Sequence, residues 1–252
     1  MFKKNNDQFN KMIVSVPDKW LSQNDISIPF NDELHIWLMN LDDLTIDFDQ
    51  EFTKLSLHDQ ERLQNIENPA QKESMTNRFI ILAKILSYYL KKAPSEVTLA
   101  KGERGKPYIE NSNIEFNFSH SFNYLVVGVT MGIEIGVDVE KIRSNVTFER
   151  LVERYFTKKE VEFYKALPVQ KQEVFFFDLW TLKEAVVKTS GLGLKIPFNT
   201  FEFPLEPDIE RVKVNYRDLS KEYIVYKCLV TNDTSITISL DKKVDKIKYF
   251  RL

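Results

Sequence analysis

Hydrophobic and polar residues alternate without interruption over residues 133–140. Successive side chains of a β-strand point to opposite faces, so this run predicts a strand with one apolar face and one polar face. The polar face carries Glu134, Gly136, Asp138 and Glu140. Two carboxylates two residues apart on one face repel each other, and a chain accepts this most readily at an exposed edge or around a cation.

The spacing of apolar residues predicts two long helices, over 73–92 and over 173–190. Pro94 ends the first helix and Gly191 ends the second. On the second helix, three chemically distinctive residues recur at every fourth position and therefore share one face: Trp180, Glu184 and Lys188.

Shorter segments complete the predicted secondary structure. Ser56 and Thr157 are each followed three residues later by an acidic residue, which is typical of a helix N-cap. The strand over 124–129 is expected to form a hairpin with the strand over 133–140 around Gly132. Further strands are expected over 35–41, 114–118, 200–203, 223–231, 235–240 and 246–252.

Some of these features recur at an offset of 101 residues: the strand 35–41 with 136–142, Ser56 with Thr157, and Phe79 with Trp180. The repeat predicts an α+β fold with two similar halves in a pseudo-twofold arrangement, each with a small antiparallel sheet packed on a long helix. The predicted divisions are an N-terminal extension over 1–33, a first half over 34–134 and a second half over 135–252.

Composition and charge narrow the class of protein. The chain has 252 residues, 43% of them hydrophobic, and a formal net charge of −2, which does not favour non-specific binding to nucleic acid or anionic membranes. No apolar signal segment follows Met1, and the most apolar helical stretch, 79–90, is too short to span a bilayer. The single cysteine, Cys228, predicts a reducing compartment and therefore a cytoplasmic protein.

Taken one at a time, the polar residues are also compatible with ordinary structural roles. Asp138 fits a solvated strand face, and Glu184 with Lys188 fits a surface ion pair of roughly 0.3–0.5 kcal/mol. Ser119 and His120 are adjacent on a predicted strand and point to opposite faces, which argues against a Ser–His nucleophile. Their hydroxyl and imidazole groups are better suited to hydrogen bonding with a phosphate.

The order of the motifs is more informative than any one of them. Along the chain they are Gly105-Lys106-Pro107, Phe116-Asn117-Phe118-Ser119-His120-Ser121, Gly136-Val137-Asp138-Val139-Glu140, Trp180-x-x-Lys183-Glu184-x-x-x-Lys188 and Gly191-x-Gly193-Leu194. Over residues 34–205 this order and spacing resemble the phosphopantetheinyl transferase family, in particular its two-domain, monomeric, surfactin-synthetase-activating (Sfp-like) branch.

The resemblance implies an activity and its partners. Family members move the phosphopantetheine arm of coenzyme A onto a serine hydroxyl of an apo acyl or peptidyl carrier protein and release adenosine 3′,5′-bisphosphate. The implied metal is Mg²⁺, with Mn²⁺ as the alternative. Neither nucleic acid nor membrane is an expected partner. The chain is thus expected to be an enzyme of the holo-[carrier-protein] synthase type.

The resemblance also implies roles for the acidic strand and the second helix. Asp138, Glu140 and Glu184 are the expected Mg²⁺ ligands. Glu184 is further expected to help take the serine proton, directly or through water. Lys188 is expected to neutralise charge on the coenzyme A pyrophosphate.

A second implied group binds the nucleotide of coenzyme A. Ser119 and His120 are expected on the 3′-phosphate side, with Lys106 nearby. Arg62 and Arg78 are the candidate basic partners near the first long helix.

The chain departs from the family pattern beside these arginines. Phe79 stands where a hydroxyl residue is expected, and Lys72 is an alternative basic partner.

Two other interpretations stay open at this level. One is a non-catalytic relative that binds coenzyme A or a carrier protein without turnover. The other is an unrelated Mg²⁺-dependent phosphohydrolase. The complete carboxylate set of Asp138, Glu140 and Glu184 favours the transferase over a decayed homologue.

Overall fold

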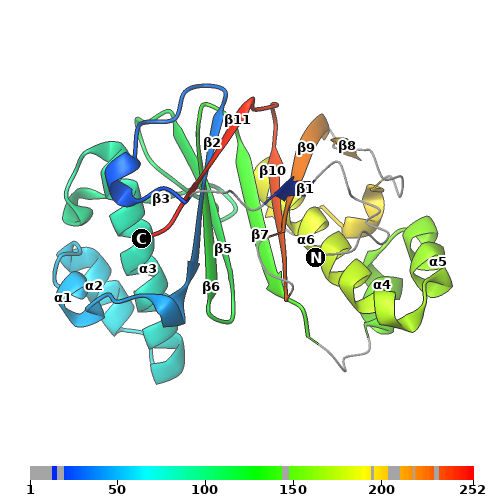
Figure 1. The fold of residues 1–252 in the computed structure, drawn as a ribbon, viewed down its shortest axis with the longest axis horizontal. Helices are drawn as coiled ribbons and strands as arrows, with labels where there is room; N and C mark the ends of the chain where they lie inside the picture. Colours follow the sequence, from blue (N-terminus) through cyan, green and yellow to red (C-terminus); the bar gives the residue numbers. More distant parts are fainter. Residues whose placement is uncertain are drawn as a thin grey trace.

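The structure is a computed structural model that describes residues 13–15, 20–143, 148–193, 196–203, 211–217, 219–229 and 233–252. In this described part, two sheets pack face to face, and one long helix covers the outer face of each sheet (Figure 1). The layers therefore follow the order α3, first sheet, second sheet, α6. None of the described helices is long and apolar enough to cross a membrane.

The first sheet has the strand order β11–β2–β6–β5. The second has the order β1–β9–β10–β7, and β8 also pairs with the long strand β9. Neighbouring strands are antiparallel except for β11 with β2 and β1 with β9. The strands are β1 Ile13–Ser15, β2 Glu33–Asn40, β5 Ile114–Ser121, β6 Tyr124–Met131, β7 Ile135–Lys141, β8 Arg211–Tyr216, β9 Leu219–Leu229, β10 Thr234–Leu240 and β11 Lys246–Phe250.

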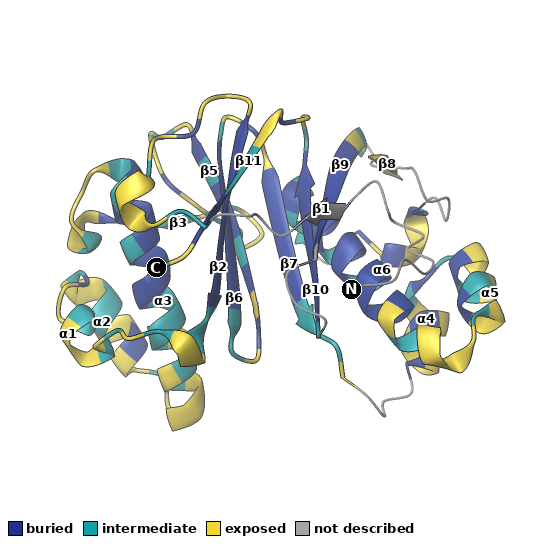
Figure 2. Ribbon diagram, in the orientation of Figure 1, coloured by how far each residue is buried: buried dark blue, intermediate teal, exposed yellow. Residues whose placement is uncertain are grey.

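Two helices of 22 residues, α3 (Pro69–Leu90) and α6 (Val169–Ser190), occupy equivalent places on the two sheets. Shorter helices, α1 (Phe48–Phe52), α2 (Leu57–Gln64), α4 (Glu149–Tyr155) and α5 (Lys158–Ala166), lie outside them and are largely exposed on their outer sides (Figure 2). A two-stranded ribbon, β3 (Ala100–Lys101) with β4 (Pro107–Tyr108), completes the first half.

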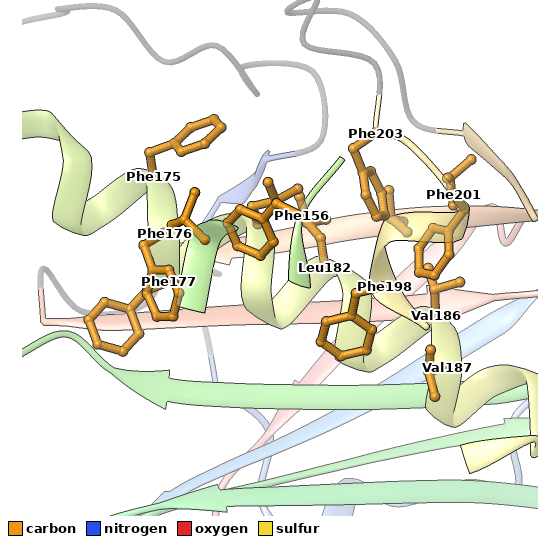
Figure 3. Packing of buried hydrophobic residues seen from close by; sticks show 14 of the residues in the cluster. Phe156, Phe175, Phe176, Phe177, Leu182, Val186, Val187, Phe198, Phe201 and Phe203 are labelled. Atoms are coloured by element: carbon orange, nitrogen blue, oxygen red, sulfur yellow. The ribbon is translucent and has the colours of Figure 1, made fainter. Parts of the chain in front are cut away.

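Alternation along the strands builds the core. Ile36 and Leu38 of β2 face Val137 and Val139 of β7 in an apolar layer between the two sheets. Outside the second sheet, α6 packs in a cluster rich in phenylalanine (Figure 3). The predicted fold class, with two similar α+β halves each built of a small sheet on a long helix, is therefore confirmed.

The predicted helices are present, with earlier starts. Asn68 caps α3 through its side chain, and Pro69 occupies the first helical turn, where its missing N–H costs nothing. α6 begins directly after Pro168. Ser56 and Thr157 are the side-chain N-caps of α2 and α5, as predicted.

The predicted hairpin between 124–129 and 133–140 is wrong. β6 pairs with β5 on one edge and with β2 on the other, so it has no edge left for β7, which pairs with β10 in the second sheet. β7 instead packs across the face of β6. Gly128 permits this contact, because a Cβ there would lie 2.5 Å from Ile135 Cδ1.

Two other expectations are corrected at the C-terminal end. Residues 198–200 form a 3₁₀ turn in place of the start of a strand over 200–203, and the backbone carbonyls of Phe198 and Phe201 accept hydrogen bonds from Lys183 Nζ.

β11 was assigned to the second half but pairs with β2 of the first sheet. The N-terminal extension likewise supplies β1 to the second sheet. Residues 230–231 of the predicted strand 223–231 lie outside the described residues.

Candidate active site

The edge strands of the two sheets, β5 and β7, are joined by side chains of β5. Asn117 Oδ1 accepts the backbone N–H of Val137 at 2.8 Å, and Ser121 Oγ accepts the backbone N–H of Lys141 at 3.0 Å. Residue numbers rise in the same direction along both strands, so β5 and β7 run parallel. The odd-numbered polar side chains of β5 therefore point toward β7 and form hydrogen bonds with it.

Asp138 lies at the centre of this contact and is 4% exposed. Its Oδ1 accepts hydrogen bonds from Ser119 Oγ at 2.8 Å and from Lys188 Nζ at 2.6 Å. Lys188 Nζ also donates to Ser119 Oγ at 3.1 Å and to the carbonyl oxygen of Val137 at 3.0 Å. One strand of the first half and a strand and a helix of the second half therefore meet at one carboxylate.

Glu140 and Glu184 flank Asp138. Ser121 Oγ donates to Glu140 Oε2 at 2.9 Å. Burial, and then the charge of Asp138, raises the pKa of Glu140 above its ordinary value. The same two causes raise the pKa of Glu184 to about 7. The two carboxyl groups are thus destabilised in their charged forms by their surroundings.

The carboxylates of Asp138, Glu140 and Glu184 offer oxygen donors of the kind that a divalent cation requires. Asp138 Oδ2 is buried and has no hydrogen-bond partner among the described residues. An unsatisfied carboxylate oxygen between two carboxyl groups that repel it suits a hard cation. Among the described residues, no three His, Cys, Asp or Glu side chains are grouped closely enough to hold one ion. The unsatisfied oxygen of Asp138, with one neighbouring carboxylate, would fit Mg²⁺ in its usual form, in which substrate phosphates and water complete the coordination.

Gly136 allows α6 to approach this strand. A Cβ at Gly136 would lie 2.1 Å from the carbonyl oxygen of Ala185 and 2.5 Å from the backbone nitrogen of Thr189. Such distances exclude any side chain. The glycine of the Gly-x-Asp-x-Glu motif therefore brings the helix that carries Glu184 and Lys188 against the strand that carries Asp138.

A pocket of about 430 Å³ lies on the opposite side of β5, against α3. His120, next in sequence to Ser119, lines it together with Phe118. The strand alternation therefore divides neighbouring residues between the carboxylate centre and this pocket. The other lining residues are Arg62, Leu63, Met75, Arg78, Phe79, Leu82, Leu99, Lys101, Gly105 and Pro107.

The pocket is electropositive. Arg78 is half-buried and forms no ion pair among the described residues. Arg62 is paired with Asp59 at 3.4 Å, and its guanidinium lies 4.7 Å from the centre of the Phe79 ring. Burial, then Arg78 and Lys188, lowers the pKa of His120 to about 4. His120 is therefore neutral at pH 7 and offers a hydrogen bond, while the arginines supply the charge.

Three predicted nucleotide contacts have different partners in the structure. Ser119 is buried on Asp138 and Lys188 and does not line the pocket. Lys106 Nζ donates to the carbonyl oxygens of Ile135 at 2.9 Å and Thr189 at 3.4 Å. Lys72 Nζ donates to the carbonyl oxygen of Gln64 and is not a lining residue.

Glu184 also lines a second pocket, of about 480 Å³. Trp180, one turn earlier on α6, forms part of its wall, and its ring lies edge-on to Tyr155 and Phe198. The Trp180–Glu184–Lys188 face predicted from sequence is the half-buried side of α6.

The sequence did not identify Asn117 and Ser121 as parts of the site, nor the burial of Lys183 beside it. The signal for the first two was present, because polar residues stand at 117, 119 and 121 on one face of β5. No local signal shows that Lys183, between Trp180 and Glu184, is fully buried and paired with Glu160 at 2.9 Å. Leu194 of the final motif lies outside the described residues.

The chain is similar in sequence to several known proteins. A family model described as the 4′-phosphopantetheinyl transferase superfamily matches residues 134–239, and one described as 4′-phosphopantetheinyl transferase, N-terminal, matches residues 44–131. The 4′-phosphopantetheinyl transferase HetI of Nostoc sp. is 31% identical over 69% of this chain and 76% of its own length. The 4′-phosphopantetheinyl transferase Sfp of Bacillus subtilis is 28% identical over 51% of this chain and 57% of its own length.

Among solved structures, the holo-[acyl-carrier-protein] synthase of Thermotoga maritima matches with a TM-score of 0.31 and 16% identity. That match covers 44% of this chain and 63% of the synthase.

Proposed function

The chain belongs to the 4′-phosphopantetheinyl transferase family and transfers phosphopantetheine to a carrier protein; we propose that it takes this group from coenzyme A with Mg²⁺ as its metal. The observation that carries the proposal is the surroundings of Asp138. This buried carboxylate contacts Ser119 of the first half and Lys188 of the second. His120, the residue after Ser119 on β5, lines an electropositive pocket on the other side of the strand. A ligand with a nucleotide phosphate at one end and a pyrophosphate beyond it could place the first in this pocket and the second near Asp138 and Lys188.

The 3′-phosphate end of coenzyme A binds, in this proposal, in the pocket on α3. Arg78 and Arg62 supply positive charge, and neutral His120 donates a hydrogen bond. The pyrophosphate then lies toward Asp138. Lys188 neutralises the negative charge that the departing phosphate gains.

The transfer is a displacement at phosphorus. The carrier's serine oxygen bonds to the phosphorus that bears pantetheine, and the bond from that phosphorus to the bridging oxygen breaks, which releases adenosine 3′,5′-bisphosphate. The hydroxyl proton passes to Glu184, directly or through water, because the Glu184 carboxylate lines the open pocket beside the site and can accept a proton there. The pocket that Glu184 shares with Trp180 gives the serine access to it.

Asp138, Glu140 and Glu184 are the residues that would hold Mg²⁺, one or two of them directly and the rest through water. Bound there, Mg²⁺ supplies charge neutralisation and orientation of the pyrophosphate. The protein's own contribution is positioning, which is the main requirement of phosphoryl transfer. We also propose that the enzyme is a monomer that works in the cytoplasm. Its single cysteine, Cys228, is buried, in keeping with a reducing compartment.

The proposal is tested by intact-mass spectrometry of an apo carrier protein incubated with this protein, coenzyme A and Mg²⁺. The expected result is a gain of one phosphopantetheine, which EDTA blocks and added Mg²⁺ restores. Transfer that continues in EDTA would remove the metal from the proposal. Coenzyme A binding without transfer to fatty-acid or peptide-synthetase carriers would contradict the activity itself. Hydrolysis of coenzyme A without any carrier would point to a phosphohydrolase.

Asp138→Asn tests the centre of the site. The substitution keeps the shape and removes the charge, and kcat/KM is expected to fall on the order of 10²–10³-fold. Glu134→Gln is the matched control, since Glu134 belongs to the same alternating face but is exposed and paired with Lys221. Near-normal kinetics for Asp138→Asn would contradict the metal assignment.

A further inference from the structure

The turn from Gly102 to Lys106 connects the two strands of the β3–β4 ribbon and borders the α3 pocket. Two backbone hydrogen bonds close it, from Gly102 N to Lys106 O and from Gly105 N to Gly102 O, both at 2.9 Å. Gly105 has a φ of +83°, which an L side chain adopts only with strain. Gly105 and Pro107 both line the pocket, so the position of this turn shapes it.

The side chain of Lys106 leaves the pocket and crosses to the second half. Its Nζ donates to the carbonyl oxygen of Ile135, the first residue of β7, and to that of Thr189, near the end of α6. Arg104, in the same turn, donates to the carbonyl oxygen of Leu192 just beyond the helix, at 3.0 Å. The last carbonyls of a helix lack intrahelical partners and favour cations, so the contact of Lys106 with Thr189 is stabilising.

The contacts of Lys106 fall where α6 and β7 are closest. Ile135 precedes Gly136, whose missing side chain permits the close approach, and Thr189 follows Lys188. Thr189 Oγ1 also donates to the carbonyl oxygens of Ala185 and Ser239, which ties the helix end to β10. A shift of Lys106 would therefore move the segments that carry the carboxylate centre relative to the pocket.

We propose that Lys106 is a positioning residue. It fixes the position of the nucleotide pocket of the first half relative to the Asp138–Lys188 centre of the second half. The inference rests on the proposed function, because a single coenzyme A molecule has to reach both regions. Lys106 then acts through the backbone of β7 and α6 and makes no contact with phosphate. A misplacement of about 1 Å between the two regions is expected to slow transfer on the order of 10²-fold.

The test compares coenzyme A with dephospho-coenzyme A in steady-state transfer by Lys106→Met. Loss of the positioning contact is expected to lower kcat on the order of 10- to 10²-fold with both substrates. The ratio of the two KM values is expected to stay at the wild-type ratio. His120→Ala is the comparison for a direct contact in the pocket, and it is expected to raise KM for coenzyme A more than for dephospho-coenzyme A.

Two further variants separate positioning from general structure. Lys106→Arg keeps a cationic donor and is expected to recover part of the lost kcat, while Lys243→Met removes an exposed lysine elsewhere and leaves kinetics unchanged. All rates are measured below the onset of thermal unfolding of each variant. A selective rise in KM for coenzyme A in Lys106→Met, or unchanged kcat, would overturn the proposal.

Failure of the proposed function itself is distinguishable. It would appear as absence of transfer from coenzyme A by the wild-type protein. In that case hydrogen exchange of peptides covering 185–193 still reports on the contact: faster exchange in Lys106→Met supports it, and unchanged exchange contradicts it.

Discussion

The helices α3 and α6 have equal length and equivalent places in the fold, but they bury different chemistry. α3 packs on the first sheet mainly through Ile81, Leu82, Ile85 and Leu86, and the polar side chains that it buries are Ser87 and Tyr89. α6 packs on the second sheet with phenylalanine and aliphatic residues, and it also buries four polar side chains: Asp178, Thr181, Lys183 and Thr189.

Each buried polar group of α6 has partners on other elements. Asp178 is paired with Lys227 of β9, and Thr181 lies 3.0 Å from the hydroxyl oxygens of Ser235 and Thr237 on β10. Lys183 donates to Glu160 of α5 and to two carbonyl oxygens. An apolar face only has to be covered, whereas a buried polar group destabilises the fold unless its partner is in place. The polar interior therefore sets the position of the helix that carries Glu184 and Lys188.

The largest expected effect comes from breaking the Lys183–Glu160 pair, in which both side chains are fully buried. Lys183→Met leaves the Glu160 carboxylate without its cation, and the free energy of unfolding is expected to fall by about 3–5 kcal/mol. Urea denaturation measures the change. Adding Glu160→Gln to this variant removes the unpaired charge and is expected to restore part of the loss. A change below about 1 kcal/mol for Lys183→Met would show that the pair is not needed to hold α6.

The next largest effect is a dependence of the free energy of unfolding on pH, through the buried His35 under α3. There, Trp37 Nε1 donates to Tyr89 OH, which faces His35 Nδ1 at 3.0 Å. Burial, and then Lys248, lowers the pKa of His35 to about 4, against about 6.5 in the unfolded chain. The unfolded chain thus binds the proton first, and stability is lost as the pH falls from 6.5 toward 4. At pH 5 the loss from His35 is roughly 2 kcal/mol.

Denaturation of wild type and of His35→Gln at pH 7 and pH 5 isolates this contribution. The wild-type protein is expected to lose more stability than the variant between the two pH values. Equal losses would contradict the assignment of a neutral, buried His35.

The smallest expected effect compares the thirteenth residue of each long helix, Thr181 in α6 and Ile81 in α3, both fully buried. Thr181→Val removes a hydroxyl that interacts with Ser235 and Thr237, and it is expected to cost about 1 kcal/mol. Ile81→Val is expected to cost a similar amount, about 0.5–1.5 kcal/mol, through lost packing. A double-mutant cycle with Thr237→Val distinguishes the two causes, since coupling is expected for Thr181 and none for Ile81.

For the strand that carries Asp138, the local pattern predicted the side-chain faces correctly but not the pairing partner. Alternation predicted that Asp138 shares a face with Gly136 and that Ser119 and His120 point apart, and the structure has both arrangements. The same patterns assigned β7 to the wrong partner. Pairing depends on which strand edges are left free, and the edges of β6 are taken by β2 and β5.

Local patterns in the sequence were enough to predict the long helices, the helix caps and the strand faces, and to single out the candidate carboxylates and cations. These follow from backbone periodicity and from residue chemistry over a few neighbouring positions. Contacts between distant segments were needed to show that Ser119 contacts Asp138, that Lys106 crosses to the second half, that Lys183 is buried and that β11 joins the first sheet. Each of these depends on where a long side chain or a strand edge finds a partner among residues far away in sequence, and local periodicity carries no information about that.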